Sequence, residues 1–210
     1  MQDIHVEVTK KLVQINTIKI QPSNPFTWAS GWKAPIYCDN RKILSYPDAR
    51  TFIRDQFVKQ IREKYPEAEV IAGVATGAIA HGMLVAQELG LPFIYVRSKP
   101  KDHGLENLIE GDLKVGQKVV IIEDLVSTGV SSLKAAEAIT NFGGDVLGMM
   151  AIFTYNFPVA KENFEEAGIE LTTLSRYKTL IDVALESGEV KESQVESLNQ
   201  WRQDPANWGK

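Results

Sequence analysis

The chain has 210 residues, of which 44% are hydrophobic and 24% are charged, and its formal net charge is -4. This composition indicates one globular domain over residues 1–210 with a sizeable core, and the acidic balance excludes nucleic-acid binding through an overall positive field. Because Cys38 is the only cysteine and no long apolar run occurs, an intramolecular disulfide, a paired-cysteine metal site and a membrane span are excluded, and we expect a cytoplasmic protein.

The N-terminal part of the chain combines a helix with a hairpin-like element. Apolar residues recur at helical spacing over residues 3–16, which predicts an amphipathic helix. Residues 26–41 differ, because proline and glycine residues separate two short extended pieces, as in a hairpin. The segment is rich in aromatic residues, and we expect Trp28 and Trp32 to pack in a core or an interface.

An alternation of strands and helices follows. Ser45 is the expected N-cap of a helix that has Pro47 in its first turn and stops by Pro66. The pattern then predicts strands at 69–74, 93–96, 118–123, 146–153 and 170–173, and helices at 78–89, 131–142 and 158–167. Two terminal helices, at 178–186 and 192–202, are expected on the outside. This alternation predicts an α/β fold with a mostly parallel sheet flanked by helices.

The segment 119–132 carries the strongest chemical signal. Four aliphatic residues predict a strand buried on both faces, and Glu123 and Asp124 stand where we expect that strand to end. A short loop of Ser, Thr and Gly leads from there into the next helix. Open α/β sheets bind ligands at the carboxyl ends of their strands, and main-chain amides at a helix N-terminus favour an anion. Acids beside an anion site suit a ribose 5-phosphate.

Basic residues are concentrated after the strand at 93–96. Arg97, Lys99, Lys101 and His103 could neutralise a diphosphate, with arginine offering two donors and lysine a point charge. Residues 98–111 contain two glycines and no clear periodicity, as expected for a mobile lid.

The segment 119–132 closely resembles the phosphoribosyl-diphosphate-binding signature of the type I phosphoribosyltransferases: an aliphatic run, two acids, an aliphatic pair and Thr/Ser-x-Gly. The resemblance implies the fold of that family, with a helix and base-covering hood over 1–45, a core over 46–175 and terminal helices over 176–210. It also implies that Glu123 and Asp124 bind the ribose hydroxyls, directly or through water on a metal. The 5-phosphate would be wrapped by Ser127, Thr128, Gly129, Val130 and Ser131.

Two further segments resemble the orotate-specific branch of this family. The spacing Arg-x-x-x-Lys-Asp-His-Gly at 97–104 is similar to its lid, which implies that Lys101 and His103 act in the neighbouring subunit of a homodimer. Ser-Gly followed by Pro-x-Tyr is similar to its hood, which implies that Tyr37 stacks on the pyrimidine. Lys33 and Arg41 are the nearby cations for a base carboxylate.

The chain also departs from the pattern of that branch. Ala29 stands where a lysine is expected before Ser-Gly, and Tyr155 stands where an arginine is expected. In the family the loop at 72–80 contacts diphosphate through main-chain amides, often with an unusual peptide conformation, which points to Thr76 and Gly77 here. A lysine often found in this loop is absent.

The implied reaction transfers the 5-phosphoribosyl group from 5-phosphoribosyl 1-diphosphate to orotate, giving orotidine 5′-monophosphate and diphosphate in de novo pyrimidine (UMP) biosynthesis. Lys101, His103 and Asp124 would be catalytic, and Mg²⁺ would bind mainly through substrate oxygens and water. Two alternatives remain. A phosphoribosyltransferase for another base, such as a purine, would keep the acids and the phosphate loop, although the lid and hood patterns argue against it. A non-catalytic sensor of the same donor usually carries a nucleic-acid-binding domain, which neither the N-terminal extension nor the charge balance supports.

Overall fold

The computed structural model describes residues 3–28, 30–98 and 108–209. Its centre is a six-stranded sheet in the order β10-β9-β8-β5-β6-β7. The strands are β5 (Val70–Val74), β6 (Phe93–Val96), β7 (Ile109–Glu110), β8 (Lys118–Val126), β9 (Asp145–Thr154) and β10 (Leu171–Arg176). Neighbouring strands are parallel except for the antiparallel pair β6–β7. The predicted mostly parallel sheet is therefore confirmed.

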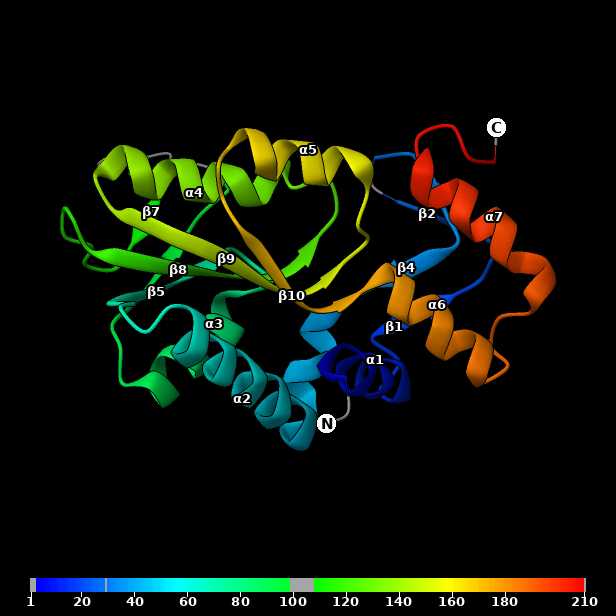
Figure 1. Cartoon of the computed structure of the whole chain (residues 1–210), viewed down its shortest axis with the longest axis horizontal. Coiled ribbons are helices and arrows are strands. Elements are labelled where there is room, and N and C mark those ends of the chain that lie inside the picture. The colour runs from blue at the N-terminus through cyan, green and yellow to red at the C-terminus, as the bar shows by residue number, and fades with distance from the viewer. Residues whose placement is uncertain (1–2, 29, 99–107, 210) are drawn as a thin grey trace.

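Helices cover both faces of this sheet (Figure 1). One face carries α4 (Val130–Phe142) and α5 (Pro158–Glu166), and the other carries α1 (Ile4–Gln14), α2 (Pro47–Lys64) and α3 (Ile79–Leu89). Every residue of β5 is buried, and so are the four consecutive aliphatic residues 119–122 of β8. Their unbroken apolar runs are explained by this burial on two sides.

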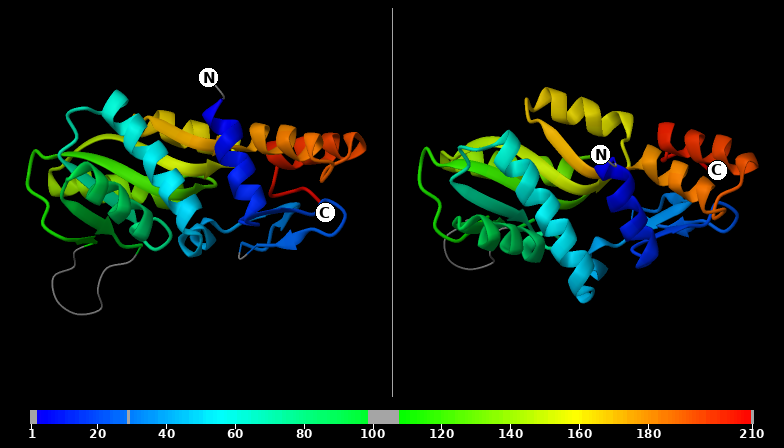
Figure 2. Two further views of the ribbon diagram at one scale, coloured as in Figure 1. Left: turned by 90° about the horizontal axis from the view of Figure 1, so that it is seen from below. Right: turned by 60° about the horizontal axis from the view of Figure 1, so that its bottom comes forward.

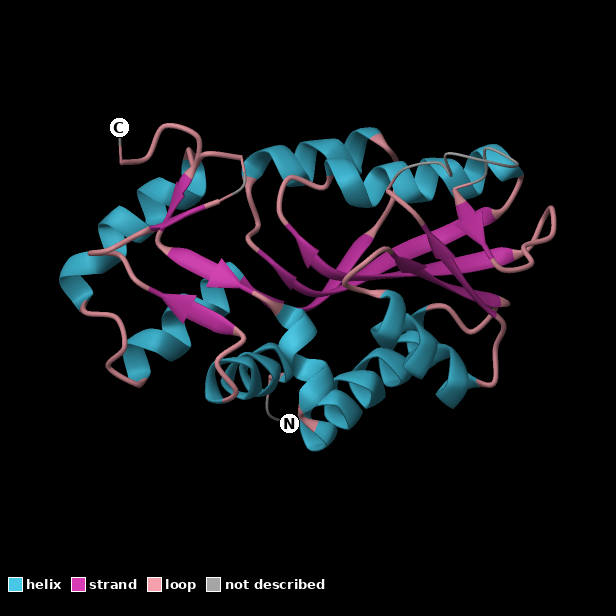
Figure 3. Cartoon of the chain, turned by 180° about the vertical axis from the view of Figure 1, so that it is seen from behind, coloured by secondary structure: helices cyan, strands magenta, loops and turns pink. Residues whose placement is uncertain are grey.

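A small hood of four short strands, β1 to β4, lies beside the two C-terminal helices (Figures 1 and 3). In it β1 (Ile18–Ile20) pairs with β4 (Ile36–Cys38), and β2 (Phe26–Thr27) pairs with β3 (Lys33–Ala34), each antiparallel. The helices are α6 (Tyr177–Glu186) and α7 (Glu192–Gln203), and Figure 2 shows them at the same end of the molecule as the hood. The hairpin prediction is thus confirmed, and β1 is an addition to it.

An aromatic cluster fastens the hood to the rest of the fold. The ring of Trp28 lies 5.1 Å from that of Tyr155 and 5.7 Å from that of Trp201, centroid to centroid. Tyr155 stacks on Phe157 at 5.4 Å, and Trp201 Nε1 donates to the carbonyl of Lys33 at 3.2 Å. The packing role predicted for Trp28 is confirmed, and Tyr155 serves the same cluster.

Two predicted boundaries are wrong. The N-cap of α2 is Tyr46 rather than Ser45, because Ser45 closes the 3-10 helix η1 (Asn40–Ser45) that precedes it. Strand β8 does not end at the acid pair but continues to Val126, because β9 runs alongside it as far as Thr154. In the parts of the chain that the structure describes, no helix is long and apolar enough to cross a membrane.

Candidate active site

A cavity of about 970 Å³ opens at the carboxyl ends of β5, β6 and β8. Its lining brings together most of the residues that the sequence singles out: Arg41, Thr76, Gly77, Arg97, Glu123, Asp124, Thr128, Val130 and Ser131. Ser127 and Gly129 belong to the same loop but not to this lining, and Tyr37 also lies outside it. Lys99, Lys101 and His103 lie outside the described residues.

The two adjacent acids have different surroundings. Glu123 is only 5% exposed, and its carboxylate accepts hydrogen bonds from the Asp124 N–H at 2.9 Å and from Ser132 Oγ at 2.8 Å. Burial, followed by the negative charge of Asp124, raises the pKa of Glu123 well above its ordinary value. Asp124 is half-buried at the cavity wall. Both acids line the cavity, but Asp124 is the more exposed of the two, and both carboxylate oxygens of Glu123 already accept hydrogen bonds.

The loop after β5 approaches the Asp124 carboxylate closely. A Cβ atom built on Gly77 would clash with both carboxylate oxygens of Asp124, so only glycine fits at this position with the carboxylate where it is. The peptide bond between Ala75 and Thr76 is cis, in line with the unusual conformation that the family resemblance implies. Thr76 is exposed toward the cavity.

The loop between β8 and α4 places a helix N-terminus at the cavity. Gly129 is the N-cap of the 13-residue α4 and adopts a left-handed conformation with φ 82°. Asn163 on α5 donates to the carbonyl of Thr128 at 2.9 Å and so fixes the loop from outside. Val130 and Ser131 are exposed at the start of the helix. Free amides and the helix dipole together make this end of the cavity suitable for a phosphate.

The described residues on either side of 99–107 lie at the cavity. Both Ser98 and Leu108 line the cavity, and the Arg97 N–H donates to the carbonyl of Leu108 at 2.8 Å. The Arg97 guanidinium lies 3.6 Å from a carboxylate oxygen of Glu110. Strand β7 pairs with β6 directly after this point of the chain.

The segment that directly follows the hood contributes one charged pair to the cavity wall. Arg41 donates to Asp39 Oδ1 at 2.6 Å, and this hydrogen bond lowers the pKa of Asp39. Lys33, the other candidate cation, donates to Thr27 Oγ1 at 2.9 Å within the β2–β3 hairpin and does not line the cavity. Tyr37 is 40% exposed, and its ring centroid lies 5.6 Å from that of Phe26. Of the two cations, Arg41 is the one the structure brings to the site.

Several cavity residues were missed by reasoning from the sequence. The polar residues Lys134, Glu137 and Asn141 line it from α4. Together with Val130 they recur at helical spacing, a pattern in the sequence that predicts one shared face of the helix. Cys38 lines it at the end of β4. Asn40, buried beneath the wall, donates to the Asp124 carbonyl at 2.6 Å, and no sequence pattern indicates this contact.

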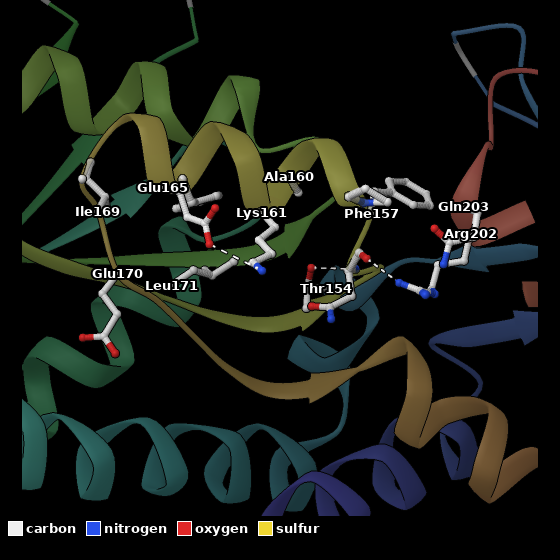
Figure 4. A pocket seen from close by; sticks show the side chains of 14 residues that line it. Thr154, Phe157, Ala160, Lys161, Glu165, Ile169, Glu170, Leu171, Arg202 and Gln203 are labelled. Carbon is white, nitrogen blue, oxygen red and sulfur yellow. Dashed lines mark hydrogen bonds and ion pairs between the residues drawn. The ribbon is translucent and has the colours of Figure 1, made fainter.

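A second cavity, of about 690 Å³, lies between α5, the start of β10 and α7 (Figure 4). Its charged groups already have partners, and that of Glu170 is Lys64, which lies outside the lining. The Lys161 ammonium lies 3.6 Å from a carboxylate oxygen of Glu165, and Arg202 donates to the carbonyl of Asn156 at 3.0 Å. The acid pair and the α4 N-terminus do not line this cavity, so it lacks the chemistry described above.

The acid-pair cavity also suits a hard cation held mainly by its substrate. Among residues 3–28, 30–98 and 108–209, no group of three or more His, Cys, Asp or Glu side chains is placed to hold a metal ion. Mg²⁺ usually keeps several waters and uses one or two carboxylates together with substrate phosphates. The half-buried Asp124 offers such a carboxylate next to an anion site.

Comparisons with known proteins give consistent results. The phosphoribosyl transferase domain family matches residues 47–165. An orotate phosphoribosyltransferase of Porphyromonas gingivalis is 60% identical over 202 residues, which cover 96% of this chain and 96% of that protein. The solved structure of Leishmania donovani UMP synthase matches with a TM-score of 0.76 and 27% identity over 93% of this chain and 42% of that one. An orotate phosphoribosyltransferase from Aeropyrum pernix has the same fold, with a TM-score of 0.76 and 24% identity over 88% of this chain and 99% of its own.

Proposed function

Because this chain belongs to the orotate phosphoribosyltransferase family, we propose that the acid-pair cavity is the active site for the reaction of that family. The reaction transfers the 5-phosphoribosyl group from 5-phosphoribosyl 1-diphosphate to orotate, giving orotidine 5′-monophosphate and diphosphate in de novo UMP biosynthesis. One observation carries this assignment. Asp124, the loop at Gly77 and the N-terminus of α4 converge on one cavity at the carboxyl ends of the strands.

The ribose 5-phosphate part of the donor fits the β8–α4 side of the cavity. In this proposal the 5-phosphate binds the main-chain amides of residues 127–131, whose helix N-terminus favours an anion. The Asp124 carboxylate then binds the ribose hydroxyls. Glu123 supports it from behind, because Ser132 and the Asp124 amide hold both of its oxygens.

The chemistry is a displacement at the anomeric carbon, where positive charge develops as diphosphate leaves. The negative charge of Asp124, placed beside the ribose, stabilises that developing charge. The amides of Thr76 and Gly77 and the cations Arg97, Lys99, Lys101 and His103 bind the diphosphate. The half-buried Asp124 carboxylate would help to hold a Mg²⁺ ion bound mainly to substrate oxygens and water, and that ion would neutralise part of the diphosphate charge.

The pyrimidine is bound from the hood. We assign binding of the orotate carboxylate to Arg41, which lines the cavity. We assign stacking on the pyrimidine ring to Tyr37, which is exposed and directly precedes the lining residue Cys38 in the chain. Because Arg41 already pairs with Asp39, orotate has to share this guanidinium with Asp39. No contact is assigned to Tyr155, which is buried in the aromatic cluster.

At the level of the whole protein, we propose a cytoplasmic homodimer in which residues 1–210 form one domain. The lid of each subunit, carrying Lys101 and His103, completes the active site of the other and excludes water that would hydrolyse the donor. The proposal includes no nucleic-acid or membrane partner.

Orotate-dependent release of diphosphate tests this function. The purified protein is mixed with 5-phosphoribosyl 1-diphosphate and either orotate, uracil, adenine or hypoxanthine, with Mg²⁺ or with a chelator. We expect rapid release with orotate and Mg²⁺ only. Release driven by a purine, or orotate-dependent release unchanged by the chelator, would contradict the proposal.

A further inference from the structure

Asn40 lies at the junction between the hood and the acid pair. It is the first residue of η1, directly after the hood, and its side chain is only 1% exposed. Its amide Nδ2 donates to the carbonyl of Asp124 at 2.6 Å, and its Oδ1 accepts from Cys38 Sγ at 3.3 Å. The same side chain thus contacts the hood residue that lines the cavity and the main chain of the exposed acid.

The Asp124 carbonyl lies in the part of β8 that no longer pairs with β5. The pairing of β5 with β8 stops at Ile122, although β8 itself continues to Val126. The Asp124 carbonyl lies beyond that point and accepts from Asn40. The hydrogen bond is part-buried, and a carbonyl shielded from water is costly to leave without a partner, so this amide contributes to holding the strand end in place.

Helix α3 also contacts Asn40. His81 on α3, five residues after Thr76, is 2% exposed. Burial lowers the pKa of His81, and a hydrogen bond to the main chain of Asn40 opposes that effect. The other ring nitrogen, Nε2, has no hydrogen-bond partner among the described residues. Asn40 therefore contacts the end of the hood, the main chain of Asp124 and the helix that follows the Thr76–Gly77 loop.

We propose that Asn40 is a positioning residue that keeps the hood in register with the Asp124 main chain, so that orotate and the ribose meet in line. It lies beneath the cavity wall and acts through its neighbours rather than on the substrates. This inference rests on the proposed function. A displacement of about 1 Å between reacting groups can lower a rate by roughly 100-fold. A hydrogen bond that fixes the hood relative to Asp124 can therefore have a large effect on kcat.

The test compares wild type with Asn40→Ala, which removes the tie, and with Asn40→Asp, which keeps its size but sets an acceptor against the Asp124 carbonyl. For both variants we expect kcat to fall on the order of 100-fold, with the KM for the donor changed less than about 3-fold. The dissociation constant of orotidine 5′-monophosphate, which spans hood and acid pair, should rise at least about 10-fold. That of the donor alone should change little.

A matched control separates positioning from a loss of stability. The Thr9 hydroxyl on α1, in a fully buried residue that does not line the cavity, donates to the His5 carbonyl at 2.6 Å. Thr9→Val removes one hydrogen bond from a buried side chain to a carbonyl, as Asn40→Ala does. We expect a lowered melting temperature in this control with kcat within about twofold of wild type.

The outcomes are distinguishable. Wild type that forms no orotidine 5′-monophosphate would overturn the proposed function. Active wild type with folded Asn40 variants of unchanged kcat would overturn only the role of Asn40. An equal loss of affinity for the donor alone and for the nucleotide would also overturn it, since Asn40 would then shape the ribose site alone.

Discussion

Glu123 and Asp124 are adjacent in the chain, yet the fold gives them different tasks. The Glu123 carboxylate, in a residue only 5% exposed, accepts a hydrogen bond from Ser132 on α4, whereas Asp124 is only half-buried, and both residues line the cavity. The sequence identified the pair but did not distinguish its members, because the partner of Glu123 is nine residues away on the next helix.

Asp124→Asn tests the assignment of the direct ribose contact. Loss of this charge should lower kcat by about 100- to 1000-fold, as for removal of one group that stabilises transition-state charge. The free energy of unfolding should change by less than about 1 kcal/mol, because the residue is only half-buried. Steady-state kinetics and urea unfolding measure the two effects.

The control for that variant is Asp182→Asn, which removes an exposed carboxylate 3.0 Å from Lys178 on α6. It should have wild-type kinetics. An Asp124→Asn enzyme as active as this control would show that the ribose is bound elsewhere.

Glu123 makes stability depend on pH in a direction that follows from its raised pKa. The fold favours the protonated carboxyl, so this contribution is complete below the ordinary pKa of 4.5 and is lost as pH rises through the raised pKa. Glu123→Gln removes the dependence. Between pH 4.5 and 8, the free energy of unfolding of wild type minus that of the variant should fall with rising pH, by at most about 1.4 kcal/mol per unit.

Urea unfolding of both proteins at each pH provides this difference, and the exposed Glu186→Gln serves as the control. Parallel pH profiles for wild type and Glu123→Gln would show that Glu123 ionises in the fold as it does in water.

The loop after β5 and the end of β8 form one unit, because Gly77 leaves room for the Asp124 carboxylate. Gly77→Ala should displace that carboxylate and lower kcat by roughly 10- to 100-fold. Gly90→Ala is the opposite case. Gly90 ends α3 at φ 69° with no atom within 4 Å of an added Cβ, so this variant should lose about 1 kcal/mol of stability and keep its kcat.

Kinetics and thermal unfolding of the two alanine variants decide between these expectations. If Gly77→Ala turns over like wild type, the contact between loop and carboxylate has no bearing on the reaction.

Helices of several turns and strands with long apolar runs were predictable from the sequence, and the shortest strands were not. The apolar runs of β5 and β8 and the periodic helices α3 and α4 appear within a few residues of their predicted positions. In contrast, β1 has three residues and β7 has two, too few to show a period. Tyr46 acts as N-cap without a side-chain hydrogen bond, so no polar residue marks that helix start.

The same limit applies to the site. The acid pair and phosphate loop are contiguous in sequence and were found together. Asn40 and Asp124 are 84 residues apart, and the fold alone brings them to 2.6 Å. Tyr155 was noted as a replacement for an arginine, but its place among Trp28, Phe157 and Trp201 depends on the packing of the hood.

At the scale of the whole molecule, a shared lid predicts complementation between subunits. Lys101→Ala and Asp124→Asn proteins should each be nearly inactive. After subunit exchange, each mixed dimer should contain one site with both residues intact and one site with neither, so activity should return to about a quarter of wild type for random mixing. Kinetics after denaturation and refolding of the mixture measure this, with each variant refolded alone as the control. No recovery in verified mixed dimers would show that each site is built from one chain.

The central claim is that the donor binds in the acid-pair cavity and not in the cavity between α5 and α7 (Figure 4). A crystal structure of the protein with 5-phosphoribosyl 1-diphosphate and Mg²⁺ tests it most directly. We predict the ribose hydroxyls on the Asp124 carboxylate and the 5-phosphate on the amides of residues 127–131. A donor bound beside Lys161 and Arg202, with Asp124 free of it, would contradict the account.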